Sequence, residues 1–400
     1  MDHELSETQR AVQEVARAFA RERILPAAAE NARLERFPVE LVRGLGELGL
    51  LAVNVPAVHG GSEAGAVAYA LALIEVAAAD CATAVTMAVT NMVGEMIARF
   101  GTPAQQARHL PRLASGAYLA GAFALSEPQA GSDAGALTTR AERRGEGWVL
   151  DGEKAWISAG DVAGVFLVFA RTPAGAGGEP AGEGVRRRAR VSAFLVEAGT
   201  PGLTAGPPES KMGLRASHTV PLVLDGCWVP DTARLGGEGE GFRLALTALD
   251  GGRIGIGAQA TGIMTAALEA SAAYAKSRRS FGRPLAEHQG VAFMLADMAT
   301  ERDTALLLTL RAAALKEAGL PFTREAAMAK LWCSEAAQRA VSRAVQLHGG
   351  NGYTDAYPVE RLFRDARVQT IYEGPSEVQR LVIAREVLRE GARFDSGGSA

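Results

Sequence analysis

Residues Gln346–Arg380, QLHGGNGYTDAYPVERLFRDARVQTIYEGPSEVQR, form the stretch around which the rest of the chain is organised. A helical pattern ends at the three glycines Gly349, Gly350 and Gly352, and a second Gly-Pro breaker follows at Gly374. Because glycine has no side chain, backbone at such positions can approach a planar or phosphorylated ligand closely. The spacing predicts two loops that meet at one site, joined by a helix with a charged face formed by Glu360, Arg361, Arg364 and Asp365.

Glu373 is the candidate catalytic base in this stretch. It is a lone acid beside Tyr372, in an apolar setting that includes Val368 and Ile371. Desolvation in such a setting raises the pKa of a carboxyl group towards the working range of a general base. From these residues alone, an exposed loop glutamate is the simpler interpretation.

The composition is that of a soluble enzyme. The chain has 400 residues, of which 48% are hydrophobic and 22% charged, enough for two or three substructures with a substantial core. A net charge of −3 gives no general attraction for phosphate backbones, so no nucleic-acid partner is expected. Cys81, Cys227 and Cys333 are widely separated and lack metal-ligand spacing, so neither a disulfide framework nor a metal site is expected.

The expected location is the cytoplasm, without a membrane partner. The first residues lack both the apolar core of a signal peptide and the Arg/Ser-rich, acid-poor character of a transit peptide. No apolar run is expected to reach membrane-spanning length.

Residues 1–115 carry helix signals and are predicted to form an all-α domain. Ser6 with Gln9 makes a capping box before a periodic run that ends near Pro26, and Thr102 with Gln105 makes another. Between them, a proline at position 38 suits the first turn of a helix that stops around Gly46 or Gly49. The alanine-rich run 66–98 suits one or two buried helices.

Residues 116–232 are predicted to form a compact β domain. Short β-rich runs alternate with Gly, Pro and Asp signals: YLAGAFAL, GWVL, KAWISA, VFLVFA, VSAFLVE and VPLVL. A hairpin turn is expected at Asp151-Gly152. The Gly/Ala/Pro-rich run Arg171–Arg190 is expected to be a mobile surface loop. Its basic end, Arg186–Arg188, is interpreted as a solvated tip rather than as a site for an acidic partner.

Residues 233–392 are predicted to form a helical bundle, followed by a frayed tail at 393–400. Long helical patterns run from Gly241 to about Arg278, from Gln289 to Gly319 and from Thr323 to His348. The sequence has no dinucleotide-binding βαβ unit, so a nucleotide site cannot rest on a GxGxxG fingerprint.

Two separate motifs carry a resemblance to the acyl-CoA dehydrogenase family, closest to its short-chain or butyryl-CoA members. GGNGYTDAYPVERLFRDARV followed by IYEGPSEVQRLVIAREVL resembles the C-terminal signature. ALSEPQAGSD, residues 124–133, resembles the other signature and, because it comes earlier in the chain, is called the first motif. The resemblance implies an α+β fold with an N-terminal α-helical domain, a middle β-barrel or sandwich and a C-terminal four-helix bundle. It also implies that Glu373 removes the substrate α-proton.

The resemblance further implies a bound FAD. In the family, backbone and hydroxyl groups of the first motif contact the flavin, an aromatic residue at Trp156 covers it, and a hydroxyl at Ser158 approaches its N5 edge. Taken alone, Trp156 is better explained as a core residue. The cofactor-binding residues implied outside the RRSFGRP segment are Phe123, Leu125, Ser126, Gly131, Ser132, Trp156, Ile157, Ser158, Gln346, Gly349, Gly350, Ser376 and Glu377.

RRSFGRP, residues 278–284, resembles the family segment that reaches the FAD pyrophosphate and adenine across a subunit interface. Arg278, Phe281 and Gln289 are the implied cofactor contacts, since arginine binds phosphate through paired hydrogen bonds. The alternative is a basic turn that ends a helix. If the resemblance holds, the protein is an oligomer, usually a homotetramer in this family.

Substrate contacts are implied at Ser132, Tyr372, Gly374 and the Asp250/Arg253 pair. An intrahelical ion pair is the competing explanation for that pair. Some relatives place the base on this helix, but Gly251 and Gly252 cannot serve. Two residues depart from the family pattern: Ala356 stands where an acid or amide is usual, and Pro375 replaces a common threonine that would hydrogen-bond the flavin region.

The implied reaction is FAD-dependent α,β-dehydrogenation of an acyl-CoA to the trans-2-enoyl-CoA. The acyl group is expected to be short or short-branched, and electrons are expected to pass to an electron-transfer flavoprotein. A flavin oxidase or monooxygenase on the same fold is the alternative enzyme. A non-enzymatic relative that binds DNA is the alternative from another class.

Overall fold

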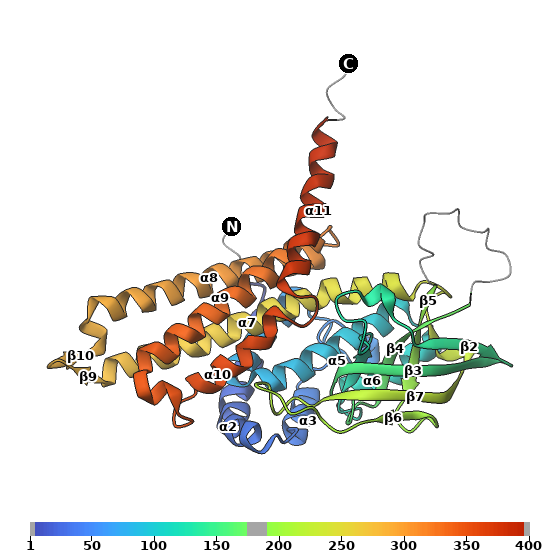
Figure 1. The fold of residues 1–400 in the computed structure, drawn as a ribbon, viewed down its shortest axis with the longest axis horizontal. Helices are drawn as coiled ribbons and strands as arrows, with labels where there is room; N and C mark the ends of the chain where they lie inside the picture. The colour runs from blue at the N-terminus through green and yellow to red at the C-terminus, as the bar shows by residue number, and fades with distance from the viewer. Residues whose placement is uncertain (1–4, 174–189, 396–400) are drawn as a thin grey trace.

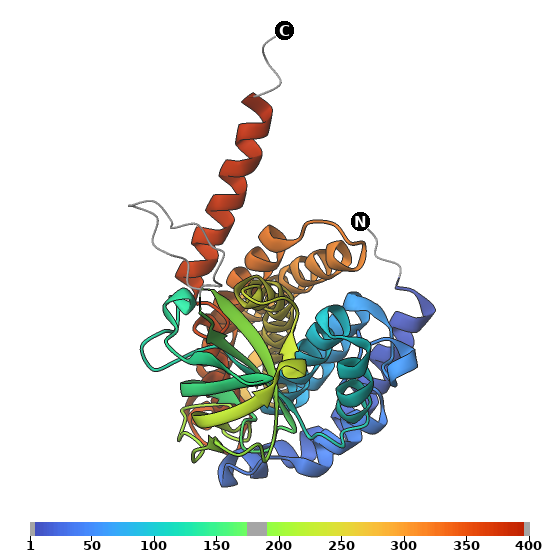
Figure 2. The same cartoon turned by 90° about the vertical axis from the view of Figure 1, so that its right-hand side faces the viewer.

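The computed structural model describes residues 5–173 and 190–395. It has N-terminal helices, a central sheet region and C-terminal helices, which is the acyl-CoA dehydrogenase fold implied by the two motifs (Figure 1). Figure 2 shows the N-terminal helices and the sheet side by side. Arg171–Arg190 lies largely outside the description, including Arg186, Arg187 and Arg188.

The N-terminal helices surround a buried pair, α4 and α5. The elements are α1 (Glu7–Phe19), the π-helix η1 (Ala20–Ile24), α2 (Leu25–Leu34), α3 (Val39–Glu47), η2 (Ala57–His59), α4 (Gly65–Ala79), α5 (Cys81–Phe100) and α6 (Pro103–Ala114). Both predicted capping boxes are confirmed, at Ser6/Gln9 and at Thr102/Gln105. Asp80 caps α5 by accepting the Thr83 N–H at 2.9 Å.

The prediction that the first helix ends near Pro26 is wrong. The helical path continues through the π turn into α2 and ends at Leu34. Pro26 lies at the start of α2, after that wider turn, where a missing N–H and the pyrrolidine ring are tolerated.

Among the described residues, α5 alone is long and apolar enough to cross a membrane by length and composition. The expectation that no run would reach this length therefore does not hold. However, 78% of that window is buried inside the fold, as in a core helix.

The sheet runs in the order β6-β7-β3-β2-β4-β5-β8, and β1 pairs with β4 in parallel. The strands are β1 (Gly121–Ala124), β2 (Arg140–Arg144), β3 (Gly147–Ser158), β4 (Val165–Arg171), β5 (Val191–Glu197), β6 (Leu203–Ala205), β7 (Thr219–Pro230) and β8 (Arg234–Leu235). Two short 3₁₀ helices, η3 (Ala134–Ala136) and η4 (Asp231–Ala233), lie between strands.

The hairpin turn predicted at Asp151-Gly152 is wrong, because β3 continues through both residues. Gly152 has a φ of 148°, and the pairing of β3 with β7 shifts register between Leu150 and Gly152. The dipeptide therefore makes a β-bulge. The turn lies instead between β2 and β3, where Gly145 has a φ of 61°.

In the C-terminal part, α7 packs against α8, α9 and α4. The elements are α7 (Gly241–Ser277), β9 (Arg279–Ser280), β10 (Arg283–Pro284), η5 (Leu285–Glu287), α8 (Gln289–Glu317), α9 (Thr323–His348), η6 (Gly349–Tyr353), α10 (Val359–Ala366), η7 (Arg367–Thr370) and α11 (Ser376–Asp395). α11 packs on α9 and then projects from the molecule (Figures 1 and 2). The predicted frayed tail is wrong for residues 393–395, since α11 continues to Asp395 through a run of helix-forming residues; residues 396–400 lie outside the description.

The charged face predicted for α10 is only half correct. Glu360 and Arg364 are partly exposed and pair at 2.8 Å, but Arg361 and Asp365 are buried. Arg361 lies 3.3 Å from Asp80, and Asp365 accepts the Leu214 N–H at 2.5 Å. Burial raises the pKa of Asp365 to about 6, against the opposing charge of Arg361. These contacts tie α10 to α5 and to the loop before β7.

Candidate active site

Glu373 lies in the turn between η7 and α11, with its carboxylate against the backbone of α7. Glu373 and Gly374 both adopt left-handed conformations, with φ of 53° and 88°. A Cβ placed on Gly252 would lie 2.0 Å from Glu373 Oε2, so this carboxylate occupies the space that a side chain at position 252 would fill. The Oε2 atom is sealed from solvent and has no hydrogen-bond partner among the described residues.

The surroundings of Glu373 suit a base that works near neutral pH. Burial raises the pKa of its carboxyl group to about 7, against the opposing charges of Lys330 and Arg253. A carboxyl group poised in this range can both accept and release a proton at physiological pH. Within the described residues, the Glu373 N–H donates to no acceptor either, so it is available to a ligand oxygen.

The carbonyl of Gly374 is held from two sides. Lys330 Nζ on α9 and Gln379 Nε2 on α11 each donate to this oxygen at 2.8 Å. Both side chains are completely buried. The turn that carries Glu373 is therefore fixed between two helices.

Tyr372 is anchored on the other side of Glu373. Its hydroxyl donates to Gln259 Oε1 of α7 at 2.6 Å, and Gln259 is itself buried. Tyr69 of α4 faces the same stretch of α7, because a Cβ on Gly255 would lie 2.9 Å from its hydroxyl. Burial, reinforced by the charge of Glu373, raises the pKa of Tyr69, which therefore stays neutral.

The Asp250/Arg253 pair forms the intrahelical ion pair of the competing explanation. Arg253 is buried, and burial lowers the pKa of its guanidinium despite the charge of Asp250. Asp250 also accepts the Thr323 hydroxyl at 2.7 Å. The Arg253 Nε atom has no partner among the described residues, which leaves one donor available beside Glu373.

A narrow cavity adjoins the two glycines of α7. Gly251 and Gly252 form part of its wall, together with Tyr69. The remaining lining residues are Asn54, Asn91, Met92, Glu95, Met96, Arg99, Thr247, Ala248, Lys316 and Phe322.

The residues expected to contact flavin near the reacting atoms converge in the sheet region. The Ala155 N–H donates to the Ser126 carbonyl at 2.9 Å, which places the first motif beside Trp156. Trp156 is 64% exposed and has a left-handed φ of 64°, so the core interpretation of this tryptophan is wrong. An exposed indole on a backbone in a strained conformation is suited to packing against a planar ligand.

The other flavin-facing positions vary in exposure. Gly131 and Ser132 are exposed, and no atom lies within 4 Å of a Cβ placed on Gly131. Phe123 and Ser158 are half-buried, while Leu125 and Ile157 are buried beneath them. At the start of α11, the buried Ser376 Oγ has no partner among the described residues, and Glu377 is exposed. These features fit a bound FAD.

A buried ion pair holds the first motif in place. Lys154 Nζ lies 2.8 Å from Glu127 Oε1, and both side chains are shielded from solvent. Glu127 also accepts the N–H groups of Thr138 and Thr139. Burial alone would raise the pKa of Glu127, but the charge of Lys154 and these hydrogen bonds lower it to about 2. The loop from residue 127 to 139 is therefore closed around a fixed carboxylate.

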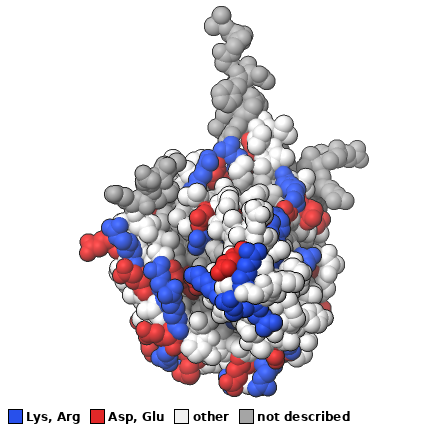
Figure 3. Space-filling model, turned by 90° about the vertical axis from the view of Figure 1, so that its left-hand side faces the viewer, with Lys and Arg blue, Asp and Glu red and all other residues white. Residues whose placement is uncertain are grey.

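A second group of predicted cofactor residues lies far from Glu373. Arg278, Phe281 and Gln289 are exposed at the end of the bundle, and Phe281 at the β9–β10 hairpin is 96% exposed. Arg278 is separated from Gly252 by roughly 39 Å along α7, at 1.5 Å per residue. The structure therefore does not bring this group to the base within one chain. Figure 3 faces this end and shows basic side chains gathered near its centre.

The same end of the bundle contains the other predicted loop. Gln346, Gly349 and Gly350 are exposed where α9 ends, and no atom lies within 4 Å of a Cβ placed on either glycine. Tyr274 stacks on His348 with ring centroids 4.2 Å apart, which joins the ends of α7 and α9. Gly352 instead packs against the Val345 carbonyl, so its role is structural. The expected meeting of this loop with Glu373 at one site is therefore not observed within one chain.

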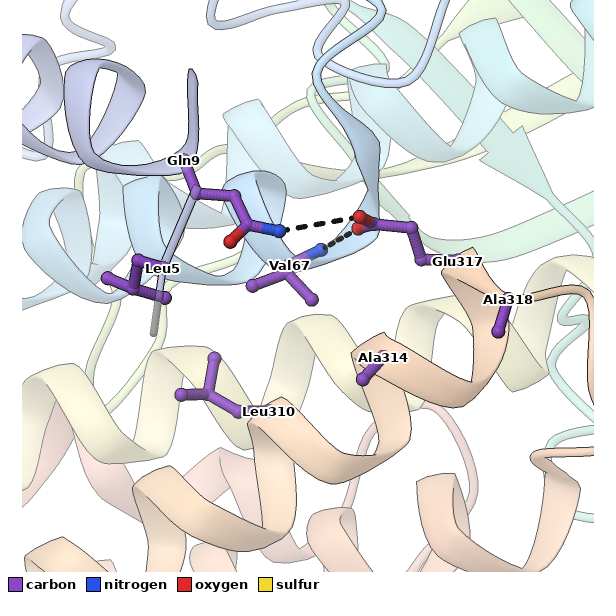
Figure 4. A pocket seen from close by; sticks show the side chains of 7 residues that line it. All are labelled: Leu5, Gln9, Val67, Leu310, Ala314, Glu317 and Ala318. Atoms are coloured by element: carbon purple, nitrogen blue, oxygen red, sulfur yellow. Dashed lines mark hydrogen bonds between the residues drawn. The ribbon is translucent and has the colours of Figure 1, made fainter. Parts of the chain in front are cut away.

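A larger cavity, about 340 Å³, lies away from Glu373 between α1, α4 and α8. It is lined by Leu5, Gln9, Val67, Leu310, Ala314, Glu317 and Ala318 (Figure 4). Its carboxylate, Glu317, accepts the Val67 N–H at 2.9 Å and so caps α4, which has no side-chain cap of its own. This capping role accounts for the presence of Glu317 in the cavity, so no bound ligand is needed to explain its carboxylate.

Sequence reasoning missed Lys330, Gln379, Tyr69 and the Glu127–Lys154 pair. A usable signal existed for Lys330, which is a lone cation in an otherwise apolar stretch. Tyr69 and Gln379 gave no such signal, because only the packing of helices brings them to Glu373.

Three family models match consecutive parts of the chain: the acyl-CoA dehydrogenase N-terminal domain at residues 6–117, the middle domain at 122–227 and the C-terminal domain at 239–388. The mitochondrial short-chain specific acyl-CoA dehydrogenase of Mus musculus is 45% identical over 388 residues, covering 96% of this chain and 91% of that protein.

Two solved structures are similar over 97% of this chain and 100% of theirs, each with 38% identity. One is butyryl-CoA dehydrogenase from Megasphaera elsdenii, with a TM-score of 0.91. The other, with a TM-score of 0.92, belongs to a study of the electron transferring flavoprotein of Acidaminococcus fermentans and flavin-based electron bifurcation. The resemblance drawn from the two motifs is thus confirmed, and the chain belongs to the FAD-dependent acyl-CoA dehydrogenase family.

Proposed function

We propose that this protein converts a short-chain acyl-CoA to the trans-2-enoyl-CoA, with Glu373 as the base that removes the α-proton. The observation that carries this proposal is the Glu373 carboxylate itself. It lies over Gly252, lacks a partner for Oε2 among the described residues, and has a pKa raised to about 7 by burial.

The proton leaves the substrate α-carbon for a carboxylate oxygen of Glu373, and the electron pair of that C–H bond becomes the new C=C bond. When bound, FAD supplies the acceptor for the β-hydrogen and its electron pair. The free N–H of Glu373 donates to the thioester oxygen and stabilises the negative charge that develops there. Trp156, Ser126, Ser132 and Ser158 are proposed to hold the flavin in place.

The proposed acyl group has about four to six carbons. Each buried methylene adds roughly 0.8 kcal/mol to binding only while the pocket has room, so the preference should end at the length that fills the pocket. Tyr69 lines the narrow cavity beside Gly252, and the hydroxyl of Tyr372 is bonded to Gln259 on the same helix. The short-chain name of the mouse relative and the butyryl-CoA name of the M. elsdenii enzyme support the same choice.

The proposed partners are acyl-CoA, an electron-transfer flavoprotein that takes up the electrons, and further copies of this chain. The similar structure from the study of the A. fermentans electron transferring flavoprotein supports the flavoprotein partner. A homotetramer is supported by exposed apolar side chains on the projecting α11, where Leu381 and Leu388 are 71% and 75% exposed. In such an assembly, Arg278, Phe281 and Gln289 of one copy can complete the cofactor site of another.

We also propose a cytoplasmic location. Cys81, Cys227 and Cys333 are all free and buried, as a reducing compartment leaves them.

The deciding experiment compares wild-type protein with Glu373→Gln. Glutamine keeps the size of the side chain but cannot accept the α-proton, and loss of a general base costs about 10²–10⁴-fold in rate. The variant is expected to bind FAD and butyryl-CoA, to be reduced by dithionite, and to remain oxidised after anaerobic mixing with butyryl-CoA. Reduction by substrate at the wild-type rate would move the base elsewhere, Asp250 being the next candidate. Rapid turnover of butyryl-CoA by the wild type with oxygen as the sole electron acceptor would identify an oxidase instead.

A further inference from the structure

Lys330 is a buried cation that the proposed reaction does not use. Its side chain is 0% exposed on α9, and burial lowers the pKa of its ammonium to about 8. A buried charge is costly unless it is paired and hydrogen-bonded. The compensation comes from the turn of the base: Nζ donates to the Gly374 carbonyl at 2.8 Å, and the charge of Glu373 favours the protonated amine.

Gln379 approaches the same carbonyl from α11. Its Nε2 lies 2.8 Å from the Gly374 oxygen and 3.3 Å from the Glu373 oxygen. A Cβ on Gly374 would come within 2.8 Å of that nitrogen, so a larger residue would push the amide away. Donors from two helices thus converge on a turn whose first residue, Glu373, is a non-glycine residue at a φ of 53°. Such a conformation persists only when its surroundings hold it.

We propose that Lys330 is a positioning residue for the base. With Gln379 it holds the Gly374 carbonyl, and thereby keeps Glu373 in its left-handed conformation with the carboxylate over Gly252. This inference rests on the proposed function, because it takes Glu373 to be the base.

Lys330 also acts on Glu373 through its charge. The other charged or titratable groups around Glu373 are Arg253 and Asp250 on α7, Tyr69 on α4 and the adjacent Tyr372. Glu335 and Glu377 act on Lys330 from α9 and α11. Of these groups, Lys330 has the largest effect in keeping Glu373 ionised, followed by Arg253. Removing it therefore raises the pH at which the base becomes active.

The test uses FAD-loaded wild type and four variants. Lys330→Met removes charge and donor, while Lys330→Arg keeps both. Gln379→Met removes the second donor without changing charge. Arg380→Met is the matched control, because Arg380 also joins α11 to α9, through Glu335 at 2.7 Å, but on the exposed surface. The rate of flavin reduction by butyryl-CoA is measured against pH. The infrared band of the protonated Glu373 carboxyl, identified by its loss in Glu373→Gln, is titrated without substrate.

In Lys330→Met, the acid limb of the rate profile and the infrared titration should both move upward by about one pH unit, as expected for loss of a nearby opposite charge. Lys330→Arg should restore both. Gln379→Met should lower the rate at every pH without moving the limb, and Arg380→Met should change neither. Lys330→Met should also lower the plateau rate, as Gln379→Met does, because the Gly374 carbonyl loses a donor. A Lys330→Met protein with the wild-type plateau rate, or with the wild-type infrared titration, would overturn the inference. Failure of the wild type to reduce its flavin with any acyl-CoA would instead overturn the proposed function, while the infrared titration would still test Lys330.

Discussion

The carboxylate of Glu373 occupies the space that a side chain at Gly252 would fill. A Cβ on Gly252 would lie 2.0 Å from Glu373 Oε2, which is too close for two non-bonded heavy atoms, so one of them would have to move. A residue near the C-terminus therefore depends on the absence of a side chain in the middle of α7.

Gly252→Ala is expected to displace the Glu373 carboxylate and lower the rate of flavin reduction by about 10²-fold or more, as for a misplaced catalytic group. The protein should still fold and bind FAD, because the displaced atom is the end of a flexible side chain. Gly251→Ala is the control. Its Cβ would meet only Lys316 Nζ, at 3.1 Å. Equal rates in the two alanine variants would contradict the prediction.

Glu373→Gln is expected to be more stable than wild type above pH 7. The carboxyl group titrates near 4.5 when unfolded and at about 7 when folded. Between these values the folded state binds more protons, so the free energy of unfolding of the wild type falls as pH rises. Glutamine does not titrate, so the advantage should grow from pH 4.5 to 7 and reach about 3 kcal/mol.

Thermal midpoints of the holoenzyme at pH 5 and pH 8 measure this difference. Glu142→Gln is the control, since it removes an exposed carboxylate on β2, away from Glu373 and from the implied cofactor contacts. A Glu373→Gln advantage that shrinks as pH rises would show that the sign is wrong.

Arg278→Ala is expected to lower FAD retention. The guanidinium is exposed at the end of the bundle, roughly 39 Å along α7 from Gly252, so its proposed phosphate contact belongs to another copy of the chain. The amount of flavin kept after gel filtration, with the assembly mass measured in the same run, checks this prediction. Lys276→Ala is the matched control, one exposed cation two residues earlier. Full retention of FAD in an Arg278→Ala tetramer would remove Arg278 from the cofactor site.

Tyr69→Ala is expected to extend the range of acyl chains. Tyr69 is buried and borders both the environment of Glu373 and the cavity beside Gly252. Wild type should prefer about four to six carbons, and the variant should gain about four-fold in kcat/KM per added methylene until the new space is filled. Rates across an acyl-CoA series from C4 to C16 measure both. Tyr69→Phe should keep the wild-type profile, and a wild-type maximum at C12 or beyond would refute the short-chain assignment.

Sequence reasoning was most successful where the signal is local. The capping boxes at Ser6 and Thr102 were predictable because each is formed by residues three positions apart. Local signals failed where a neighbouring element changed their meaning. Asp151-Gly152 forms a bulge because β7 pairs alongside β3. Pro26 does not end the helical path because the π turn before it places this residue in the first turn of α2. Arg361 is buried with Asp365 because it pairs both with that carboxylate and with Asp80, the cap of α5.

The sequence by itself determined the order of helices and strands and the family to which the chain belongs, because periodicity and motif spacing are properties of the chain alone. The tertiary structure decided the chemistry of Glu373. Its raised pKa comes from burial, its position from the space left by Gly252, and its turn from hydrogen bonds donated by Lys330 and Gln379. Desolvation and close packing depend on which residues meet in space, and Gly252 and Glu373 meet only when α7 and the turn before α11 have packed together.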